Sequence, residues 1–150
     1  MCFTGSNHGR CEGEGHAAVE VELSNYEDLI HAKAGHLPPQ QVRRVRVRGV
    51  VDSGAARLVI PAAVAKQLGL ESSGTAAVHY ADRRTAERDI VENVYLAYAG
   101  RHGVFTAIVE PSRESLLVGA IVMEDLDLIV DCANQRLIPR DPQRIVSEIE

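Results

Sequence analysis

Between residues 44 and 54 the chain alternates arginine with valine, and it then runs through two adjacent valines into the tripeptide Asp-Ser-Gly. The alternation has a period of two, so one face of this stretch points toward a core and the other toward water, as in a β-strand. The adjacent pair Val50-Val51 predicts that the strand is buried where it ends. The tripeptide then predicts a sharp turn directly after a buried strand.

Short runs rich in Val, Leu and Ile recur along the rest of the chain and are separated by turn residues. The predicted strands are residues 19–23, 42–51, 57–60, 75–81, 85–98, 104–109, 115–119, 128–131 and 136–138. Short helices are predicted at residues 27–34, 61–68 and 120–125, the first two ending before a glycine. The sequence therefore predicts a mostly-β domain.

The chain of 150 residues is long enough for one domain. Residues 1–18 are rich in Gly, Ser, Asn and His and show no periodicity, so we expect a loose N-terminal tail. Residues 19–140 form the predicted domain. Residues 141–150 are expected to be a C-terminal tail or a short helix.

The charge pattern argues against some partners. The formal net charge is −5 and the sequence pI is near 5.7, which does not favour nucleic acid as a partner. The arginines at positions 43, 44, 46 and 48 could still bind nucleic acid or an acidic peptide, but a solvated strand face is the preferred interpretation.

We see neither a membrane-spanning apolar run nor the apolar segment of a signal peptide, so we expect no membrane partner and a cytoplasmic location.

The candidate catalytic residues are Asp52, Ser53 and Gly54. A carboxylate at the end of a buried strand is partly removed from water, and desolvation disfavours its charged form. Gly54 allows the sharp turn and lets backbone N–H groups approach the carboxylate. Ser53 adds a hydroxyl that can hold the turn or bond across a symmetry axis. The tripeptide could also be an ordinary turn that ends a strand.

A single carboxylate can act only as a general base, whereas two adjacent carboxylates share a proton, as in the dyad of aspartic proteases. One carboxyl group then accepts a proton from water while the other donates one to the substrate carbonyl. The sequence contains one Asp-Ser-Gly, so a dyad requires two chains related by a two-fold axis.

Two segments resemble the signatures of retropepsin-like aspartic proteases, particularly the prokaryotic single-domain members. Residues 50–61, Val-Val-Asp-Ser-Gly-Ala-Ala-Arg-Leu-Val-Ile-Pro, resemble the catalytic segment. Residues 116–120, Leu-Leu-Val-Gly-Ala, resemble the second signature, which precedes a short C-terminal helix. The resemblance spans roughly residues 19–140. It implies a closed β-barrel of the acid-protease type with one or two short helices, and obligatory dimerisation.

The resemblance also implies a flap, a hairpin that folds over an extended peptide. The flap would lie near residues 79–85, and we expect Tyr80, Ala81, Asp82 and Arg83 to contact the substrate. Related flaps usually carry a glycine at the tip, where this chain reads Asp-Arg-Arg, so an altered or basic-gated specificity is one expectation. A second departure from the family pattern is Gly49.

The resulting hypothesis is a homodimeric aspartic endopeptidase that acts on a peptide or protein substrate and needs no metal or other cofactor. Ile60, Val118 and Ile121 are predicted walls of the substrate subsites. The alternative is a dimeric peptide-binding or regulatory module that kept the fold but does not cleave. The flap tip without glycine motivates this alternative.

Three other features have weaker functional interpretations. Cys2, His8, Cys11 and His16 are metal-ligand residue types, but their spacing matches no standard zinc pattern, so no metal site is predicted. His79 could contact substrate, although an exposed strand histidine is preferred. Asp131 follows an apolar run without a glycine turn, so a role in a hairpin is preferred over catalysis.

Overall fold

The structure is a computed structural model that describes residues 17–149. In chain order its strands are β1 (Ala18–Asn25), β2 (Arg44–Val51), β3 (Leu58–Pro61), β4 (Ser72–His79), β5 (Thr85–Tyr98), β6 (Arg101–Glu110), β7 (Leu116–Val118), β8 (Leu128–Asp131) and β9 (Arg136–Pro139). Its helices are α1 (Tyr26–Lys33), α2 (Ala62–Gln67), α3 (Ala120–Leu126) and the short 3-10 helix η1 (Pro39–Gln41). The prediction of a mostly-β domain is confirmed.

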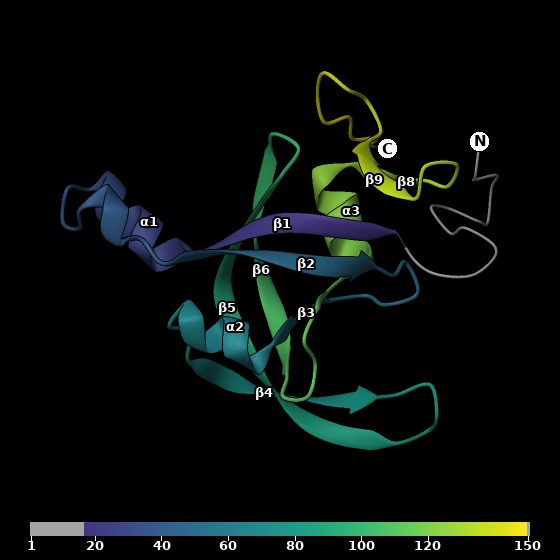
Figure 1. Cartoon of the computed structure of the whole chain (residues 1–150), viewed down its shortest axis with the longest axis horizontal. Helices are drawn as coiled ribbons and strands as arrows, with labels where there is room; N and C mark the ends of the chain where they lie inside the picture. Colours follow the sequence, from purple (N-terminus) through teal and green to yellow (C-terminus); the bar gives the residue numbers. More distant parts are fainter. Residues whose placement is uncertain (1–16, 150) are drawn as a thin grey trace.

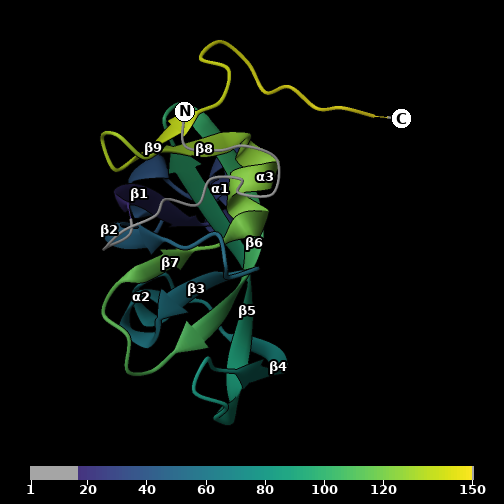
Figure 2. The ribbon, with the colours of Figure 1, turned by 90° about the vertical axis from the view of Figure 1, so that its right-hand side faces the viewer.

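Six strands close into a barrel (Figure 1). Its strands follow the order β1-β2-β7-β3-β6-β5, and β5 pairs with β1 to close the circle. The seventh strand of this sheet, β4, pairs with β5 and extends it beyond the barrel. A separate hairpin of β8 and β9 lies beside α3, at the end of the barrel away from β4 (Figure 2). The predicted closed barrel is confirmed, and its three α-helices are all short.

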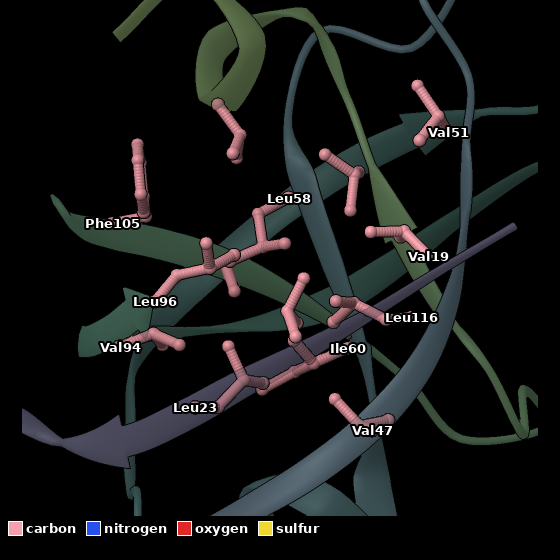
Figure 3. Packing of buried hydrophobic residues seen from close by; sticks show 14 of the residues in the cluster. Val19, Leu23, Val47, Val51, Leu58, Ile60, Val94, Leu96, Phe105 and Leu116 are labelled. Carbon is pink, nitrogen blue, oxygen red and sulfur yellow. The ribbon is translucent and has the colours of Figure 1, made fainter. Parts of the chain in front are cut away.

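The barrel interior is filled by aliphatic side chains from alternate strand positions (Figure 3). In β2, Val47 and Val51 are buried while Arg44, Arg46 and Arg48 are exposed, as the period-two pattern predicts. Fully burying one such aliphatic side chain contributes about 1.5–3 kcal/mol, so each of these buried valine and leucine positions stabilises the fold. The largest fully buried side chains are Leu23, Leu58, Ile60, Leu68, Leu96, Leu116 and Leu126.

Strand β5 changes partners along its length, and this change positions the β4–β5 hairpin. Its first half pairs with β4, and its second half pairs with β6 and β1. The register with β6 shifts between Val91 and Val94, where Asn93 has a φ of 64°. Such a bulge bends a strand, so the hairpin leaves the barrel wall instead of continuing around it.

The first helix is fixed to the barrel by polar contacts. Asn25 caps α1 by accepting a hydrogen bond from the Asp28 amide (3.1 Å). The buried Asp28 carboxylate accepts three hydrogen bonds from Arg43, two of them from its guanidinium at 2.8 and 3.0 Å. Arg43 is therefore committed to a structural ion pair, whereas Arg44, Arg46 and Arg48 lie on the solvated face.

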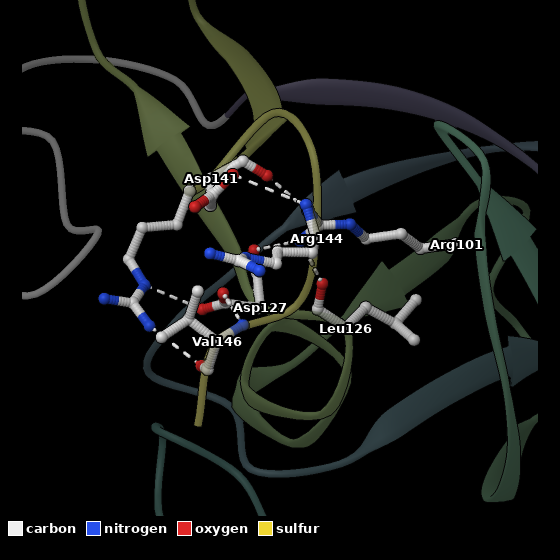
Figure 4. Close-up of polar contacts among 7 residues, drawn as sticks. Arg101, Leu126, Asp127, Asp141, Arg144 and Val146 are labelled. Carbon is white, nitrogen blue, oxygen red and sulfur yellow. Dashed lines mark hydrogen bonds and ion pairs between the residues drawn. The ribbon is translucent and has the colours of Figure 1, made fainter. Parts of the chain in front are cut away.

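A second polar cluster attaches the C-terminal segment to the turn after α3 (Figure 4). Arg101 donates to the carbonyl oxygens of Leu126 (2.9 Å) and Asp127 (2.8 Å). The Asp127 carboxylate accepts from Arg140 Nε (2.7 Å) and from the Val146 amide (3.0 Å). Residues 141–149 contain no helix or strand, yet these contacts hold the first part of the segment in place.

Within residues 17–149, the helices are all too short or too polar to cross a bilayer.

Candidate active site

Asp52 is the first residue of the connection between β2 and β3, residues 52–57, which we call the catalytic loop because it carries the candidate catalytic residues. Although β2 and β3 are consecutive in sequence, they are not neighbours in the sheet, because β7 lies between them. β7 runs parallel to β2 and antiparallel to β3. The second signature, residues 116–120, contains β7, and β7 therefore lies between β2 and β3, the two strands joined by the first signature.

Backbone hydrogen bonds connect the catalytic loop to β7 and to the start of α3. The Asp52 amide donates to the carbonyl oxygen of Val118 (3.0 Å). The amides of Ala120 and Ile121 donate to the carbonyl oxygens of Ala55 (2.7 Å) and Ala56 (3.0 Å). The position of Asp52 is therefore set by a strand that lies more than sixty residues further along the chain.

Two glycines allow this close packing. A Cβ atom on Gly119 would lie 2.3 Å from the carbonyl oxygen of Arg57 and 2.7 Å from that of Ala55. A Cβ atom on Gly49 would lie 2.9 Å from the Cβ atom of Leu116. The close approach of β7 to β2 therefore explains why this chain has glycine at position 49, where it departs from the family pattern. Sequence reasoning missed the packing role of both glycines, which depends on a contact between distant segments.

The Asp52 side chain is half-buried, and its Oδ1 atom accepts a hydrogen bond from the Gly54 amide (2.9 Å). Its other carboxylate oxygen accepts no hydrogen bond from the residues that the structure describes. Ser53 is half-buried, and it lines a hollow between the catalytic loop, α3 and β8. Gly54 and Ala56 are exposed, so the loop presents an uncovered surface around the carboxylate.

The predicted flap is the β4–β5 hairpin, and we call residues 80–84 the flap turn. The catalytic loop and the flap turn emerge on the same side of the barrel (Figures 1 and 2). Ala81, Asp82 and Arg83 are exposed, and Arg83 has a φ of 72°. Glycine favours this left-handed conformation, so an arginine takes the backbone role for which related flaps usually use glycine.

The flap turn is further ordered by its own side chains. The Asp82 carboxylate accepts from the Arg84 amide (3.0 Å) and from Arg84 Nε (2.8 Å). These hydrogen bonds, the side-chain one first, lower the pKa of Asp82 below its usual value. The Arg84 guanidinium also lies over the Tyr80 ring, 4.7 Å from its centroid.

A contact that sequence reasoning missed joins the flap to the barrel. The Tyr80 hydroxyl donates to the carboxylate of Glu110, at the end of β6. Arg88 Nε donates both to the Tyr80 hydroxyl (3.1 Å) and to Glu110 Oε1 (3.0 Å). No motif indicates this contact, because Tyr80 and Glu110 are thirty residues apart.

The comparisons with known proteins agree with this geometry. Residues 39–130 match the family model described as aspartyl protease, and this span is well over half of the chain. The chain belongs to the aspartyl protease family. No curated protein matches this aspartyl protease.

Two solved structures are similar to this aspartyl protease. EIAV protease complexed with the inhibitor HBY-793 superimposes with a TM-score of 0.54 at 15% identity, over 75% of this chain and 89% of that one. The simian foamy virus (mac) protease gives a TM-score of 0.45 at 13% identity, over 71% and 90% of the two chains. The first likeness confirms the retropepsin-like fold.

The predicted subsite walls lie in different environments. Ile60 and Val118 are 0% and 1% exposed and belong to the core of the barrel, so they are not carried into the proposal below. Ile121 is 45% exposed at the start of α3, next to the catalytic loop. The burial of Ile60 and Val118 was missed because an apolar run does not distinguish a core wall from a subsite wall.

The remaining candidate residues of this aspartyl protease can also be placed. His79 is exposed at the end of β4. Asp131 lies at the β8–β9 turn, where it accepts hydrogen bonds from the Asn134 amide (3.4 Å) and side chain (2.8 Å). The four residues weighed as zinc ligands lie outside the described residues. Residues 17–149 contain no cluster of three or more metal-ligand side chains.

Proposed function

We propose that this aspartyl protease is a homodimeric endopeptidase whose active site pairs Asp52 of one subunit with Asp52 of the other. The observation that carries the proposal is the position of Asp52. It lies half-buried on a loop whose backbone is hydrogen-bonded to β7 and to the start of α3. Because the chain has one Asp-Ser-Gly, the second carboxylate of a dyad comes from a second copy.

In the proposed reaction the two carboxyl groups hold one proton between them and bind one water molecule. The ionised carboxylate accepts a proton from the water, and the protonated carboxyl group donates its proton to the carbonyl oxygen of the scissile peptide bond. The water oxygen bonds to the carbonyl carbon, and a tetrahedral gem-diol forms. The C–N bond then breaks: the nitrogen takes the proton that the first carboxyl group accepted from water, and a gem-diol hydroxyl returns a proton to the second carboxylate, which restores the dyad. The Gly54 amide, which donates to Asp52 Oδ1, orients the carboxylate.

The flap covers the substrate in this proposal. The flap turn emerges on the same side of the barrel as the catalytic loop (Figures 1 and 2). It contains the four residues proposed to contact the substrate, Tyr80, Ala81, Asp82 and Arg83. The flap excludes water from the peptide and holds it extended. The exposed turn leaves its side chains available to contact a peptide.

The test compares cleavage of a mixed peptide library by the wild type and by Asp52→Asn, between about pH 4 and pH 7, where a shared-proton dyad works. Asparagine keeps the size of aspartate and an oxygen that accepts the Gly54 hydrogen bond, so the loop geometry is retained. We expect internal cleavage by the wild type and none by the variant, with products read by mass spectrometry. Equal cleavage by both proteins would exclude Asp52 as a catalytic residue.

The second candidate function is a dimeric peptide-binding or regulatory module without cleavage. The flap tip without glycine is the observation that favours it. This module would bind peptides with the same affinity in the wild type and in Asp52→Asn, and neither protein would cleave them. Sedimentation of both proteins as dimers would be required for that interpretation.

A further inference from the structure

A hollow lies between the flap turn and the loop that follows β6, residues 111–115. Among the residues that the structure describes, its charged groups come from three arginines and one glutamate, on a chain whose formal net charge is −5. The hollow is lined by Tyr80, Arg84, Arg88, Glu110, Ser112 and Arg113. We call it the arginine hollow.

The three arginines differ in how their charge is balanced. Arg88 is paired with Glu110 (3.0 Å) and Arg84 with Asp82 (2.8 Å). Arg113 instead donates to the carbonyl oxygen of Ser115 (2.6 Å) and to its hydroxyl (3.4 Å), which are neutral acceptors. Within residues 17–149 no carboxylate pairs with Arg113, so its positive charge is unbalanced.

Contacts among the residues that line the arginine hollow fix its shape. The Tyr80–Glu110–Arg88 contact ties one wall to the barrel, and Arg84 rests on the Tyr80 ring. The Glu110 side chain is 12% exposed, and the Arg88 side chain is 25% exposed. A site whose charged groups are already ordered loses little entropy when it binds a ligand.

The location connects the arginine hollow to the substrate. One wall is the flap turn, which covers the peptide in the function proposed above, and the inference rests on that proposal. The other wall, residues 111–115, leads directly into β7, whose Val118 carbonyl accepts from the Asp52 amide. A peptide held between the flap and the catalytic loop would therefore pass beside the arginine hollow.

We propose that the arginine hollow is a substrate subsite that selects an acidic side chain, with Arg113 as its main recognition residue. The planar guanidinium of Arg113 can donate to the carboxylate of a glutamate or aspartate on the peptide. The exposed Arg83 on the neighbouring turn adds a second positive charge that attracts the same group. An amide of the same shape would form weaker hydrogen bonds there and gain nothing from the charge.

The test uses a peptide that the wild type cleaves, acetylated and amidated at its ends, in matched forms with glutamate or glutamine at each position in turn. We expect one position at which glutamate is preferred roughly tenfold in kcat/KM, the range of a charge-assisted hydrogen bond at a partly exposed site. Arg113→Gln should remove that preference by raising KM for the glutamate peptide alone, and Arg113→Lys should retain part of it.

The matched control is Arg48→Gln, which removes an exposed arginine from the outer face of β2 and should leave the preference unchanged. Equal cleavage of the two peptides by the wild type would overturn the assignment. So would a variant Arg113→Gln that loses activity equally on both peptides, because that pattern indicates a structural role. A preference seen only with peptides carrying a free C-terminal carboxylate would overturn the assignment to a side chain.

A wild-type protein that cleaves no peptide would contradict the proposed function but would leave the subsite open to a direct test. Fluorescein-labelled glutamate and glutamine peptides would then be titrated with the wild type and with Arg113→Gln by anisotropy. Tighter binding of the glutamate peptide, lost in the variant, would support the subsite. Equal binding, or none, would overturn it.

Discussion

Gly119 has no room for a side chain, because the backbone of the catalytic loop lies directly against it. Its φ of −92° is accessible to any residue, so the requirement for glycine is one of space and not of conformation. The atoms nearest to an added Cβ belong to the backbone of Ala55 and Arg57, which cannot rotate away as a flexible side chain could. At this position a single methyl group would displace the loop that carries Asp52.

We expect Gly119→Ala to lower the free energy of unfolding by about 3 kcal/mol, since overpacking against a fixed backbone strains both segments. Cleavage activity should fall with it. The control is Gly74→Ala in β4, where an added Cβ meets no atom within 4 Å and stability should change by less than about 0.5 kcal/mol. Equal urea midpoints for the two variants, measured at one protein concentration, would contradict the close packing.

The contact between Asp28 and Arg43 makes the stability of the fold sensitive to acid. The Arg43 side chain donates to its carboxylate, and this contact lowers the pKa of Asp28 below its usual value of about 4. A carboxylate whose pKa is lower in the folded state stabilises the fold fully above the pKa of the unfolded state. That contribution is lost as the pH falls through the folded-state pKa.

Asp28→Asn should therefore lower the free energy of unfolding at pH 7 by about 1–2 kcal/mol, a modest value because the Arg43 side chain is half exposed. The difference from the wild type should shrink below about pH 4, where the wild-type carboxylate also becomes neutral. Asp125→Asn, at an exposed position on α3, is the control and should differ little at any pH. A constant difference between wild type and Asp28→Asn down to pH 2 would disprove the linkage.

At the scale of elements, the flap is a long hairpin that specific side-chain contacts attach to the end of β6. β4 is an edge strand with mostly exposed side chains, so little apolar burial holds it in place. The bulge in β5 directs the hairpin away from the barrel, and the Tyr80–Glu110–Arg88 contact ties its tip to the end of β6. Opening the flap therefore requires breaking this contact.

Tyr80→Phe removes the hydroxyl but keeps the ring on which Arg84 rests. We expect amide hydrogen exchange in residues 74–79 and 85–90 to become several-fold faster, because the open flap becomes more populated, while the barrel strands keep their rates. Tyr95→Phe is the control, since that ring stacks on Tyr26 and His102 and its hydroxyl donates to no described residue. Unchanged exchange in the flap of Tyr80→Phe would show that the contact does not restrain it.

At the scale of the whole molecule, the proposed active site is incomplete in one chain. In the function proposed above, each subunit would supply one Asp52, so the active species would be a pair in which both partners carry the carboxylate. Under that proposal a second copy would cover the surface around Asp52, where Gly54 and Ala56 of the catalytic loop and the neighbouring Ile121 are exposed. A subunit that lacks the carboxylate should therefore inactivate the wild-type subunit with which it pairs.

We expect cleavage by a fixed amount of wild type to fall to about half when an equal amount of Asp52→Asn is added and subunits exchange, because half of the wild-type subunits then lie in mixed dimers. Peptide cleavage measured after prolonged mixing checks this. Adding Arg48→Gln in place of Asp52→Asn should raise the activity, which controls for the added protein. Activity that is unaffected by Asp52→Asn would show that one chain is sufficient.

Much of the fold was predictable because its signals are local. The period-two alternation in residues 44–48 identifies a strand and its buried face without reference to any partner. Gly35 and Gly69, with φ values of 84° and 68°, end the first two helices where the sequence predicts. The turn at Asp52 was predictable in the same way, because the turn residues Asp-Ser-Gly directly follow the buried end of β2.

Only the tertiary structure decided which distant segments meet. Periodicity shows that a strand has a buried face but not which strand lies beside it, so the insertion of β7 between β2 and β3 could not be derived from spacing. The Tyr80–Glu110 contact and the burial of Ile60 and Val118 depend on that arrangement. The sequence by itself determined that a carboxylate at position 52 ends a buried strand in a tight turn, because residue type and local pattern suffice for this. Barrel closure determined what surrounds Asp52, because it brings together residues that are far apart in the chain.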